Sequence, residues 1–487
     1  MVSMGRVCKE RETINMKVLL VNPSQARIYG DLKPPIQMHM GLSYIASVLK
    51  QRGIYVELID MDADSVNEQD VAERIKKEGF AVCGITVTTP TLKSSLFLAK
   101  SIKEVSPHVS IVFGGIHPSV MAEETISFDE VDFIVRGEGE ITFVELLEEI
   151  EGSRNYNNVK GILFKNNGSI TETEDRMLIE DLDTLPFPAR DLFANKSYTY
   201  PDSLYAQTAP LITSRGCPGR CTYCNAHSIF GRRFRARSAK NIVDEIEYLT
   251  NSMGIKEIHI WDDNFVTAKN RVYEIRDEIK KRNINIKFAF PNGIRADFLD
   301  KEMLTCLKSM GTYSIAVGVE SGNQRVLDKA KKGIKLETIK RVFKVAKDLD
   351  IETWAFFMFG LPGETRETAR ETIEFAKVLD PDIAKFHILK PYPGTEAYDI
   401  LKDKGFLEET DYDKYGIHTP PIHCLEDLTS DELLLIQKKA YREFYFRPLK
   451  ILKQILRLRS LNRFKLNIKA AGGIARMALD KPKGARK

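Results

Sequence analysis

The stretch Ile212–His227, ITSRGCPGRCTYCNAH, holds three of the chain's seven cysteines within eight residues. Cys217, Cys221 and Cys224 form a Cys-x3-Cys-x2-Cys arrangement. Such close spacing of thiols indicates ligands of a metal or a cluster. We expect the four isolated cysteines to be buried or incidental thiols. The N-terminus lacks an apolar segment followed by a small-residue cleavage site, so we expect a cytoplasmic protein with reduced thiols.

Two kinds of centre are compatible with the three cysteines. A structural zinc site closes with four ligands, and a zinc ribbon would show a second Cys-x2-Cys pair, which this sequence lacks. His227 could supply the fourth zinc ligand. Three thiolates on a short glycine-containing loop, with no evident fourth ligand, suit a [4Fe-4S] cluster that leaves one iron open. An open iron can bind a small chelating molecule.

From this motif toward the C-terminus, apolar strands alternate with helical segments over residues 206–425. Six βα units are too few for a closed eight-stranded barrel, so we expect a partial (β/α)6 barrel that is open along one edge. Ligands of such a barrel bind at the C-terminal ends of the strands. The predicted strands are Pro210–Thr213, Glu257–Trp261, Lys287–Phe290, Ser314–Val319, Thr353–Phe359 and Ala384–Leu389.

Residues 1–150 show the same alternation and predict a separate α/β unit with five parallel strands, of the flavodoxin or Rossmann-like type. No GxGxxG follows the first strand, which disfavours NAD. Residues 151–205 predict a connector with a hairpin at 166–168, and residues 426–487 predict a helical region with a basic tail. The five strands are Lys17–Asn22, Val56–Asp60, Ala81–Val87, Ser110–Phe113 and Asp132–Val135.

The cysteine motif and the polar residues after the later strands resemble those of the radical S-adenosylmethionine (SAM) enzymes. In that family the loop reads Cys-x3-Cys-x-aromatic-Cys, and Tyr223 stands in the aromatic position here. The resemblance implies a [4Fe-4S] cluster whose open iron is chelated by the amino and carboxylate groups of SAM. One-electron cleavage of SAM then gives a 5′-deoxyadenosyl radical. It also implies SAM contacts at the strand ends, which are Tyr223, Asp262, Asp263, Arg295, Glu320, Ser321 and Gly360.

The residue types at these positions suit the implied contacts, although structural roles are also open to them. Acidic side chains such as Asp262 and Asp263 can accept hydrogen bonds from the SAM ammonium, or cap the following helix. Arg295 could pair with the SAM carboxylate or equally with Asp297. Gly360 lets backbone approach the adenine, because a Cβ would obstruct the ligand.

The N-terminal unit resembles the cobalamin-binding half of the B12-dependent radical SAM class. Three polar, glycine-rich loops after its strands would then surround the corrin and its nucleotide tail. The Asp-x-His-x-x-Gly motif that supplies a lower axial histidine elsewhere is missing, so we expect His117 to be a wall or tail contact. The implied cobalamin contacts are Thr86, Thr88, Thr89, Gly114, Gly115, His117, Gly137, Glu138, Gly139 and Glu140.

The resemblance implies methyl transfer from methylcobalamin to an unactivated carbon after hydrogen abstraction by the radical. An alternative within the class is oxidative cyclisation or hydroxylation without methyl transfer, as in relatives of the anaerobic cyclase of chlorophyll synthesis. A non-catalytic iron-sulfur or zinc binding module is a third reading. The expected partners are a small-molecule substrate and an electron donor such as flavodoxin or ferredoxin.

The net charge of +4 conceals a basic C-terminus, because residues 442–487 carry 14 Lys and Arg against two acidic residues. Their helical spacing predicts a basic amphipathic helix that could lie on the anionic inner face of a membrane, which would favour a lipid or isoprenoid substrate. Its apolar stripe could instead pack over the barrel. We expect no nucleic-acid partner, because the rest of the chain is acidic. The helix residues are Leu449, Leu452, Ile455 and Leu456, beside Lys450, Lys453, Arg457 and Arg459.

Overall fold

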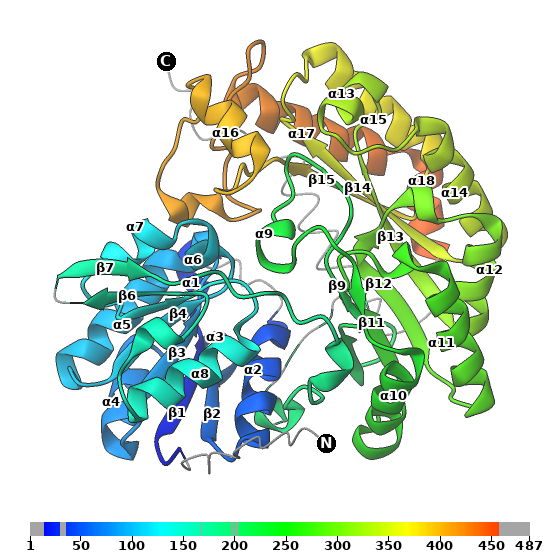
Figure 1. Ribbon diagram of the computed structural model, residues 1–487. Coiled ribbons are helices and arrows are strands. Elements are labelled where there is room, and N and C mark those ends of the chain that lie inside the picture. The colour runs from blue at the N-terminus through cyan, green and yellow to red at the C-terminus, as the bar shows by residue number, and fades with distance from the viewer. Residues whose placement is uncertain are drawn as a thin grey trace, which may run out of the picture.

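The computed structural model describes residues 14–29, 36–166, 168–194, 196, 198, 200 and 203–456, with no account of the side chains of 453–456. It contains one mixed and one parallel sheet, each in its own α/β unit (Figure 1). We refer to the N-terminal unit, which extends to residue 172, and to the barrel, which begins at residue 208. Short helices and a two-stranded ribbon lie between them.

The N-terminal unit has strands in the order β2-β1-β3-β4-β5-β6-β7. The first five are parallel in the flavodoxin-like order 2-1-3-4-5, as predicted. The last two form the predicted hairpin, but it pairs antiparallel with β5 and so extends this sheet, whereas the sequence placed it in a connector. The strands are β1 (Lys17–Asn22), β2 (Tyr55–Asp60), β3 (Val82–Thr86), β4 (Ser110–Gly114), β5 (Phe133–Val135), β6 (Ile162–Asn166) and β7 (Ser169–Glu172).

Helices cover both faces of this sheet, which explains the continuous apolar strands. Successive side chains of β1 point to opposite faces: Val18 and Leu20 pack with one apolar cluster, and Leu19 and Val21 with the other. Helices α2 (Met40–Gln51) and α8 (Gly139–Glu151) supply the first cluster, and α4 (Glu68–Glu78) and α5 (Leu92–Val105) the second. The short helices of the unit are α1 (Ala26–Tyr29), α3 (Met61–Asp64), α6 (Ile116–Val120) and α7 (Ala122–Ser127).

The barrel has six parallel strands in chain order, β8-β11-β12-β13-β14-β15, which confirms the partial barrel. Its helices lie on the outer side (Figure 1). The strands are β8 (Thr208–Leu211), β11 (Glu257–Ile260), β12 (Lys287–Ile294), β13 (Thr312–Glu320), β14 (Glu352–Phe359) and β15 (Ile383–Ile388). The helices are α10 (Ala239–Met253), α11 (Lys269–Lys281), α12 (Lys301–Met310), α13 (Gln324–Lys329), α14 (Leu336–Asp348), α15 (Arg366–Leu379) and α16 (Glu396–Asp403).

Helix α17 (Ser430–Tyr445) covers the open edge of the barrel at β15. Its side chains bind the free backbone groups of that edge strand. The Tyr445 hydroxyl accepts from the Ala384 N–H at 3.0 Å, and the Tyr441 hydroxyl accepts from the Phe386 N–H at 3.2 Å. An edge strand with unpaired backbone groups is prone to pair with other chains, so this helix takes the place of a seventh strand.

Helix α18 (Pro448–Leu456) lies in the predicted helical region, and its described residues distinguish the two orientations that the sequence left open. Lys450 is buried, and its ammonium donates to the Pro381 carbonyl. Leu449 and Leu452 are 74% and 53% exposed, so the apolar residues described here do not pack over the barrel. The Lys453, Ile455 and Leu456 side chains, and all of Arg457, Arg459 and residues 481–487, lie outside the described part. No helix among the described residues is long and apolar enough to cross a membrane.

Candidate functional site

The cysteine loop follows β8 and is held at its base by the short ribbon of β9 (Ser214–Arg215) and β10 (Arg235–Ala236). Gly216 opens the loop with φ +83°, and a Cβ there would lie 2.4 Å from the Arg233 carbonyl oxygen, so only glycine fits. The Gly216 N–H donates to Asp263 at 2.9 Å. Helix α9 (His227–Phe230) ends the loop between the two units (Figure 1).

The three thiols are half-buried and suit the ligands of an iron-sulfur cluster. Burial raises the pKa of Cys217, and it raises that of Cys224 to about 11. In the described part of the chain no three Cys, His, Asp or Glu side chains meet as the ligands of one ion. A cubane cluster binds each cysteine at a different iron, so the three thiols need not converge on one point. His227 directs Nδ1 to within 3.1 Å of the Cys224 carbonyl oxygen.

Asp262, which follows β11, is buried and turned toward the base of the cysteine loop rather than toward open space. Its carboxylate accepts from the Thr213 N–H at 2.6 Å and from the hydroxyls of Thr213 and Ser214. Asp263 accepts from Gly216, as described above. Both carboxylates therefore hold the end of β8 and the start of the loop in place.

Arg295 and Glu320 lie beside the cysteines and already have ionic partners. Arg295 pairs with Asp297 at 2.9 Å, and its other guanidinium nitrogen lies 3.7 Å from the Cys221 sulfur. Glu320 ends β13 with φ +65° and pairs with the buried Lys332 at 2.9 Å. Sequence reasoning missed Lys332, which stands among several lysines and has no motif of its own.

Tyr223 and Ser321 differ in what they offer to a ligand. The Tyr223 hydroxyl oxygen is buried and lies near the Cys221 thiol, and burial raises its pKa well above the usual range. Ser321 is fully buried, and its hydroxyl faces Thr372 at 3.1 Å and accepts from the Asn323 N–H. Ser321 therefore shapes the turn after β13.

Gly360 follows β14 with φ +86°. A Cβ there would lie 2.7 Å from His423 Nε2, whose ring donates to the Gly360 carbonyl at 2.9 Å. The Gly360 N–H donates to Glu364 at 2.5 Å, and burial raises the pKa of that carboxyl to about 8. His423 and Glu364 were not predicted, because His423 comes from a segment more than 60 residues away.

The predicted cobalamin loops follow β3, β4 and β5 at one edge of the first sheet. Gly115 has φ +101°, and a Cβ there would lie 2.9 Å from the Val87 carbonyl oxygen. His117 is buried, with Nδ1 3.2 Å from the Thr89 hydroxyl and Nε2 without a partner among the described residues. Burial lowers the pKa of His117 to about 4, so its ring is neutral. A glycine-lined edge with an orphaned imidazole nitrogen suits a large ligand.

The threonines at the end of β3 and in the loop after it differ in their exposure to solvent. Thr88 is exposed, whereas Thr89 is buried. The Thr86 hydroxyl lies 3.3 Å from Nε2 of His39. His39 caps the N-terminus of α2, because its Nδ1 accepts from the Leu42 N–H. His39 was not predicted as a site residue. Gly114 and Gly139 are half-buried, and Gly137 has φ +67° and faces the Ile229 carbonyl of α9.

Glu138 and Glu140, predicted to contact cobalamin, instead bind the barrel. Glu138 pairs with Arg215 at 2.8 Å and with Arg235 at 2.9 Å. Glu140 pairs with Arg215 at 2.5 Å. All four side chains are at most 6% exposed. Because Arg215 precedes Cys217 by two residues, the loop after β5 and the cysteine loop share one buried ionic network.

A second contact joins the units at the other side of these loops. The His117 ring meets the Tyr412 ring edge-on at 5.0 Å between centroids. The Tyr412 hydroxyl also donates to Glu124 of α7 at 3.2 Å. Lys93 of α5 pairs with Asp411 at 2.6 Å. The barrel segment around residue 412 therefore packs on the same edge of the first sheet that carries the predicted cobalamin loops.

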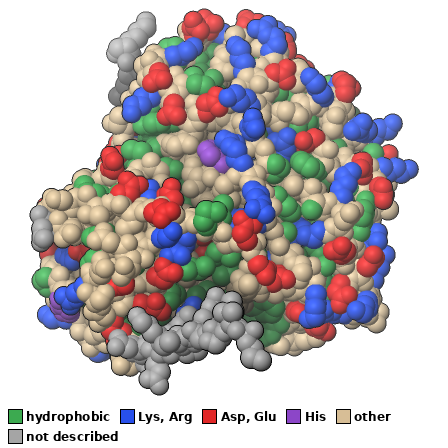
Figure 2. Space-filling view, viewed as in Figure 1, with side chains coloured by type: hydrophobic (Ala, Val, Ile, Leu, Met, Phe, Trp, Pro, Cys, Tyr) green, Lys and Arg blue, Asp and Glu red, His purple; other side chains and the backbone are tan. Residues whose placement is uncertain are grey.

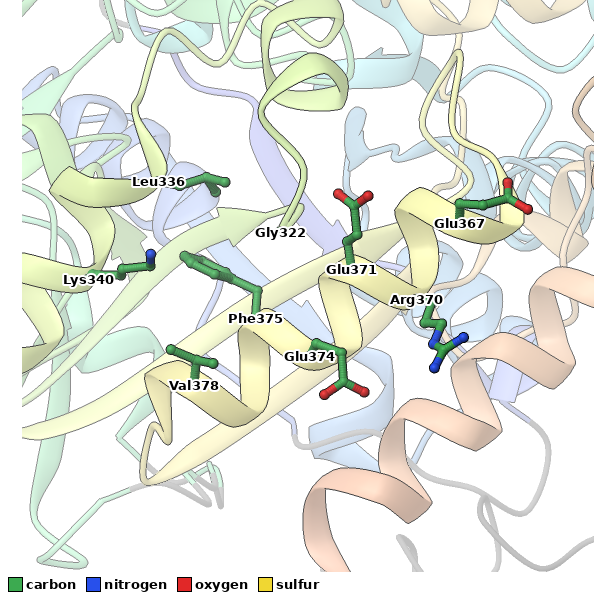
Figure 3. Close-up of a pocket in the computed structure, with 9 residues that line it drawn as sticks. All are labelled: Gly322, Leu336, Lys340, Glu367, Arg370, Glu371, Glu374, Phe375 and Val378. Carbon is green, nitrogen blue, oxygen red and sulfur yellow. The ribbon is translucent and has the colours of Figure 1, made fainter.

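A surface groove of about 550 Å³ lies away from these loops, on the outer side of the barrel (Figure 3). Most of its side chains come from α15, and Leu336 and Lys340 come from α14. None of the predicted site residues lines it. On the face shown in Figure 2, basic and acidic side chains are interspersed over both units.

Two family models match the chain on the two units described above. The radical SAM superfamily model matches residues 211–376, which include the cysteine loop and most of the barrel. The B12 binding domain model matches residues 35–147. Fold and site thus define an enzyme that combines a radical SAM barrel with a cobalamin domain.

The chain belongs to the cobalamin-dependent radical SAM family. It is 33% identical to an uncharacterised methyltransferase of Pyrococcus horikoshii, over 90% of this chain and 95% of the relative. It is 30% identical to the anaerobic magnesium-protoporphyrin IX monomethyl ester cyclase of Cereibacter sphaeroides, over 89% of this chain and 71% of the cyclase. The cofactors of the family are a [4Fe-4S] cluster, SAM and cobalamin.

The same architecture occurs in the solved structure of OxsB, a cobalamin-dependent SAM radical enzyme with aqua-cobalamin and SAM bound. The TM-score is 0.74 at 18% sequence identity, and the match covers 96% of this chain and 72% of OxsB. This likeness concerns the fold: a flavodoxin-like unit precedes an open barrel in both proteins.

Proposed function

We propose that this enzyme transfers a methyl group to an unactivated carbon of a small molecule. The observation that carries the proposal is the buried network of Arg215, Glu138 and Glu140, which joins the cysteine loop to a predicted cobalamin loop. A radical generator and a methyl carrier must both reach one substrate carbon. Rigid attachment of the two loops supports that geometry.

In this proposal Cys217, Cys221 and Cys224 would hold the cluster, and SAM would bind at the iron that has no cysteine ligand. The bound cofactors supply a 5′-deoxyadenosyl radical, which removes a hydrogen atom from the substrate, and a cobalt-borne methyl group for the resulting carbon radical. Tyr223 packs against the barrel core beside the cluster. Gly360 lets His423 pack against the end of β14, because a Cβ there would lie 2.7 Å from His423 Nε2. Asp262, Asp263 and Ser321 act on the loops that shape the site and do not themselves bind SAM.

The proposal assigns fewer residues to cobalamin than the sequence implied. Gly115, His117 and Gly137 keep their place in the loops at this edge of the sheet. Gly115 lets these loops pack against each other, because a Cβ there would lie 2.9 Å from the Val87 carbonyl oxygen. The same loops contain the other predicted contact residues, which are Thr86, Thr88, Thr89, Gly114 and Gly139. Glu138 and Glu140 hold the two units together. Exclusion of water between the units would protect the radical from side reactions.

Oxidative cyclisation or hydroxylation is a second candidate, because the cyclase of Cereibacter sphaeroides is 30% identical to this chain. SAM with a deuterated methyl group separates the two candidates. Methyl transfer predicts that the label first appears on protein-bound cobalamin and then in the product. A product that forms without label, while 5′-deoxyadenosine accumulates, would favour the second candidate.

The exposed face of α18 supports peripheral contact with an anionic membrane, and hence a lipid or isoprenoid substrate. Leu449, Ile451 and Leu452 are 74%, 44% and 53% exposed. The sequence after residue 456 contains ten Lys and Arg against one Asp. Exposed apolar side chains beside basic residues bind anionic bilayers through both burial and charge.

We expect Leu449→Ser/Leu452→Ser to weaken binding to anionic vesicles by at least about tenfold, because each buried leucine side chain contributes roughly 1.5–3 kcal/mol. Sedimentation with phosphatidylglycerol vesicles measures the effect. Met177→Ser, at an 82% exposed position in the segment between the two units, is the control and should bind like the parent chain. Equal binding by all three proteins would remove the membrane from the proposal. The proposal also includes a flavodoxin or ferredoxin as the electron donor.

A further inference from the structure

The segment between α13 and α14 fastens a buried lysine against the cysteine loop. The Thr222 N–H, between Cys221 and Tyr223, donates to the Ala330 carbonyl at 3.0 Å. Two residues later, the Lys332 ammonium lies 5.9 Å from the centre of the Tyr223 ring. The Lys332 side chain is only 8% exposed. A lysine is rarely buried to this extent without a charged partner.

The partner is Glu320, and the surrounding backbone is adapted to the pair. Lys332 Nζ lies 2.9 Å from Glu320 Oε1. Glu320 has φ +65°, a conformation that costs a residue with a side chain of order 1–3 kcal/mol and persists only where the surroundings impose it. A Cβ at Gly318 would lie 2.6 Å from the Glu320 carboxylate and 2.9 Å from the Lys332 ammonium. Glycine at position 318 leaves room for the ion pair in this position, and a larger residue would displace the ends of the two side chains.

Arg295 fixes the lysine segment from its other side. Its guanidinium donates to the Lys332 carbonyl at 2.8 Å, pairs with Asp297 and approaches the Cys221 sulfur at 3.7 Å. Two ion pairs, Arg295–Asp297 and Lys332–Glu320, therefore flank the cysteine loop. Of the two, the pair of Lys332 and Glu320 is the more deeply buried. Charges in a low-dielectric interior act more strongly on their neighbours than charges at the surface.

We propose that Lys332 and Glu320 set the reduction potential of the cluster held by Cys217, Cys221 and Cys224. The inference rests on the proposed function, because it requires a cluster at these cysteines. On reduction the [4Fe-4S] cluster passes from the 2+ to the 1+ state by gaining one electron from an external one-electron donor, with no bond formed or broken. The added negative charge is stabilised by the lysine ammonium and destabilised by the glutamate carboxylate. Lys332 and Glu320 are positioning residues in this role, since they act through the cluster.

Two single variants test the proposal through shifts of opposite sign. Lys332→Met keeps the length of the side chain and removes its charge, so the cluster should become harder to reduce. Glu320→Gln keeps the shape of the side chain and removes the negative charge, so the cluster should become easier to reduce. At a fixed potential we expect the ratio of reduced to oxidised cluster to change by about tenfold in each case, which is about 59 mV for one electron. The double variant should lie near the parent protein.

The neighbouring lysine supplies a matched control. Lys331→Met makes the same change of charge one residue away, but Lys331 is 52% exposed and pairs with Glu396 at the surface. The reduction potential of the cluster in Lys331→Met should equal that in the parent chain. Lys332→Arg keeps the positive charge and should restore the parent potential, so a loss of packing alone is distinguished from a loss of charge.

The measurement is a potentiometric titration of the reconstituted full-length chain, followed by the electron paramagnetic resonance signal of the reduced cluster and normalised to iron content. Shifts of the same sign in Lys332→Met and Glu320→Gln would overturn the inference. Shifts no larger than that of Lys331→Met would also overturn it. Failure of the parent chain to assemble any cluster would instead contradict the proposed function.

Discussion

Replacement of Cys221 by Ala should abolish both the iron-sulfur cluster and the cleavage of SAM to 5′-deoxyadenosine. Three thiolates are the whole protein ligand set that we assign to the cluster, and Cys221 lies between the other two on the loop. Loss of one thiolate leaves two irons without a protein ligand. We therefore expect iron and sulfide per chain to fall to the level of the untreated protein, and 5′-deoxyadenosine to fall to the background without enzyme.

Iron and sulfide assays after anaerobic reconstitution measure the first effect, and chromatography of the nucleoside measures the second. Cys424→Ala is the matched control, because this half-buried thiol lies outside the loop and contacts the Phe406 carbonyl. The control should retain its cluster and its nucleoside product. Retention of both properties by Cys221→Ala would show that this thiol is not a cluster ligand.

Replacement of Arg215 by Met should lower the free energy of unfolding by about 3–5 kcal/mol, the usual cost of breaking a buried ion pair on one side. The guanidinium is the shared partner of Glu138 and Glu140, whose side chains are 3% and 6% exposed. Its removal leaves Glu140 without an ionic partner among the described residues and Glu138 with Arg235 alone. The substitution should mainly weaken the contact between the two units.

Urea denaturation measures this effect through the chain's two tryptophans, Trp261 and Trp354. Trp261 packs against the core of the N-terminal unit and therefore reports on the contact between the units. Arg233→Met is the control, because Arg233 is 72% exposed and pairs with Glu180 at the surface. Such a surface pair contributes about 0–1 kcal/mol. A loss of less than about 1 kcal/mol in Arg215→Met would contradict the role assigned to the network.

The sheets were predictable from the sequence because both are buried on two faces. Val82–Thr86 lies between two helical layers, and Thr312–Glu320 lies between the outer helices and the barrel interior. Both strands are therefore apolar runs that stand out between amphipathic helices. The pairing of the hairpin β6 and β7 with β5 was not predictable in the same way. Its turn is local, but the choice of the sheet edge depends on contacts that no periodicity records.

Site residues could be predicted from the sequence where the chemistry requires a particular residue type. They could not be predicted where a charged residue pairs with a residue far away in the sequence. The cysteine spacing by itself predicted a metal or cluster loop, and the assignment of the three ligands stays a prediction. Glu138 was assigned to cobalamin because it stands on a glycine-rich loop, whereas its partner Arg215 lies 77 positions further along the chain. Lys332 was missed for the same reason, because its partner Glu320 lies 12 positions earlier and no motif links the two residues.

Helix α18 shows the limit of helical spacing as a guide to burial. The period identifies which residues share a face, but not which face turns inward. Lys450 turns inward because the Pro381 carbonyl and the Asp380 carboxylate lie beneath it, with the ammonium 3.6 Å from Asp380. Leu449 and Leu452 are consequently left at the surface.

The most direct test of the account is the fate of the SAM methyl group in the enzyme reconstituted with iron, sulfide and hydroxocobalamin. The protein is incubated under reducing conditions with methyl-deuterated SAM and a small-molecule and lipid extract, and cobalamin and products are analysed by mass spectrometry. We predict deuterated methyl on the protein-bound cobalamin, a product that carries the same intact methyl group on carbon, and 5′-deoxyadenosine formed with it. Formation of 5′-deoxyadenosine and product with no label on either cobalamin or product would contradict the proposed methyl transfer.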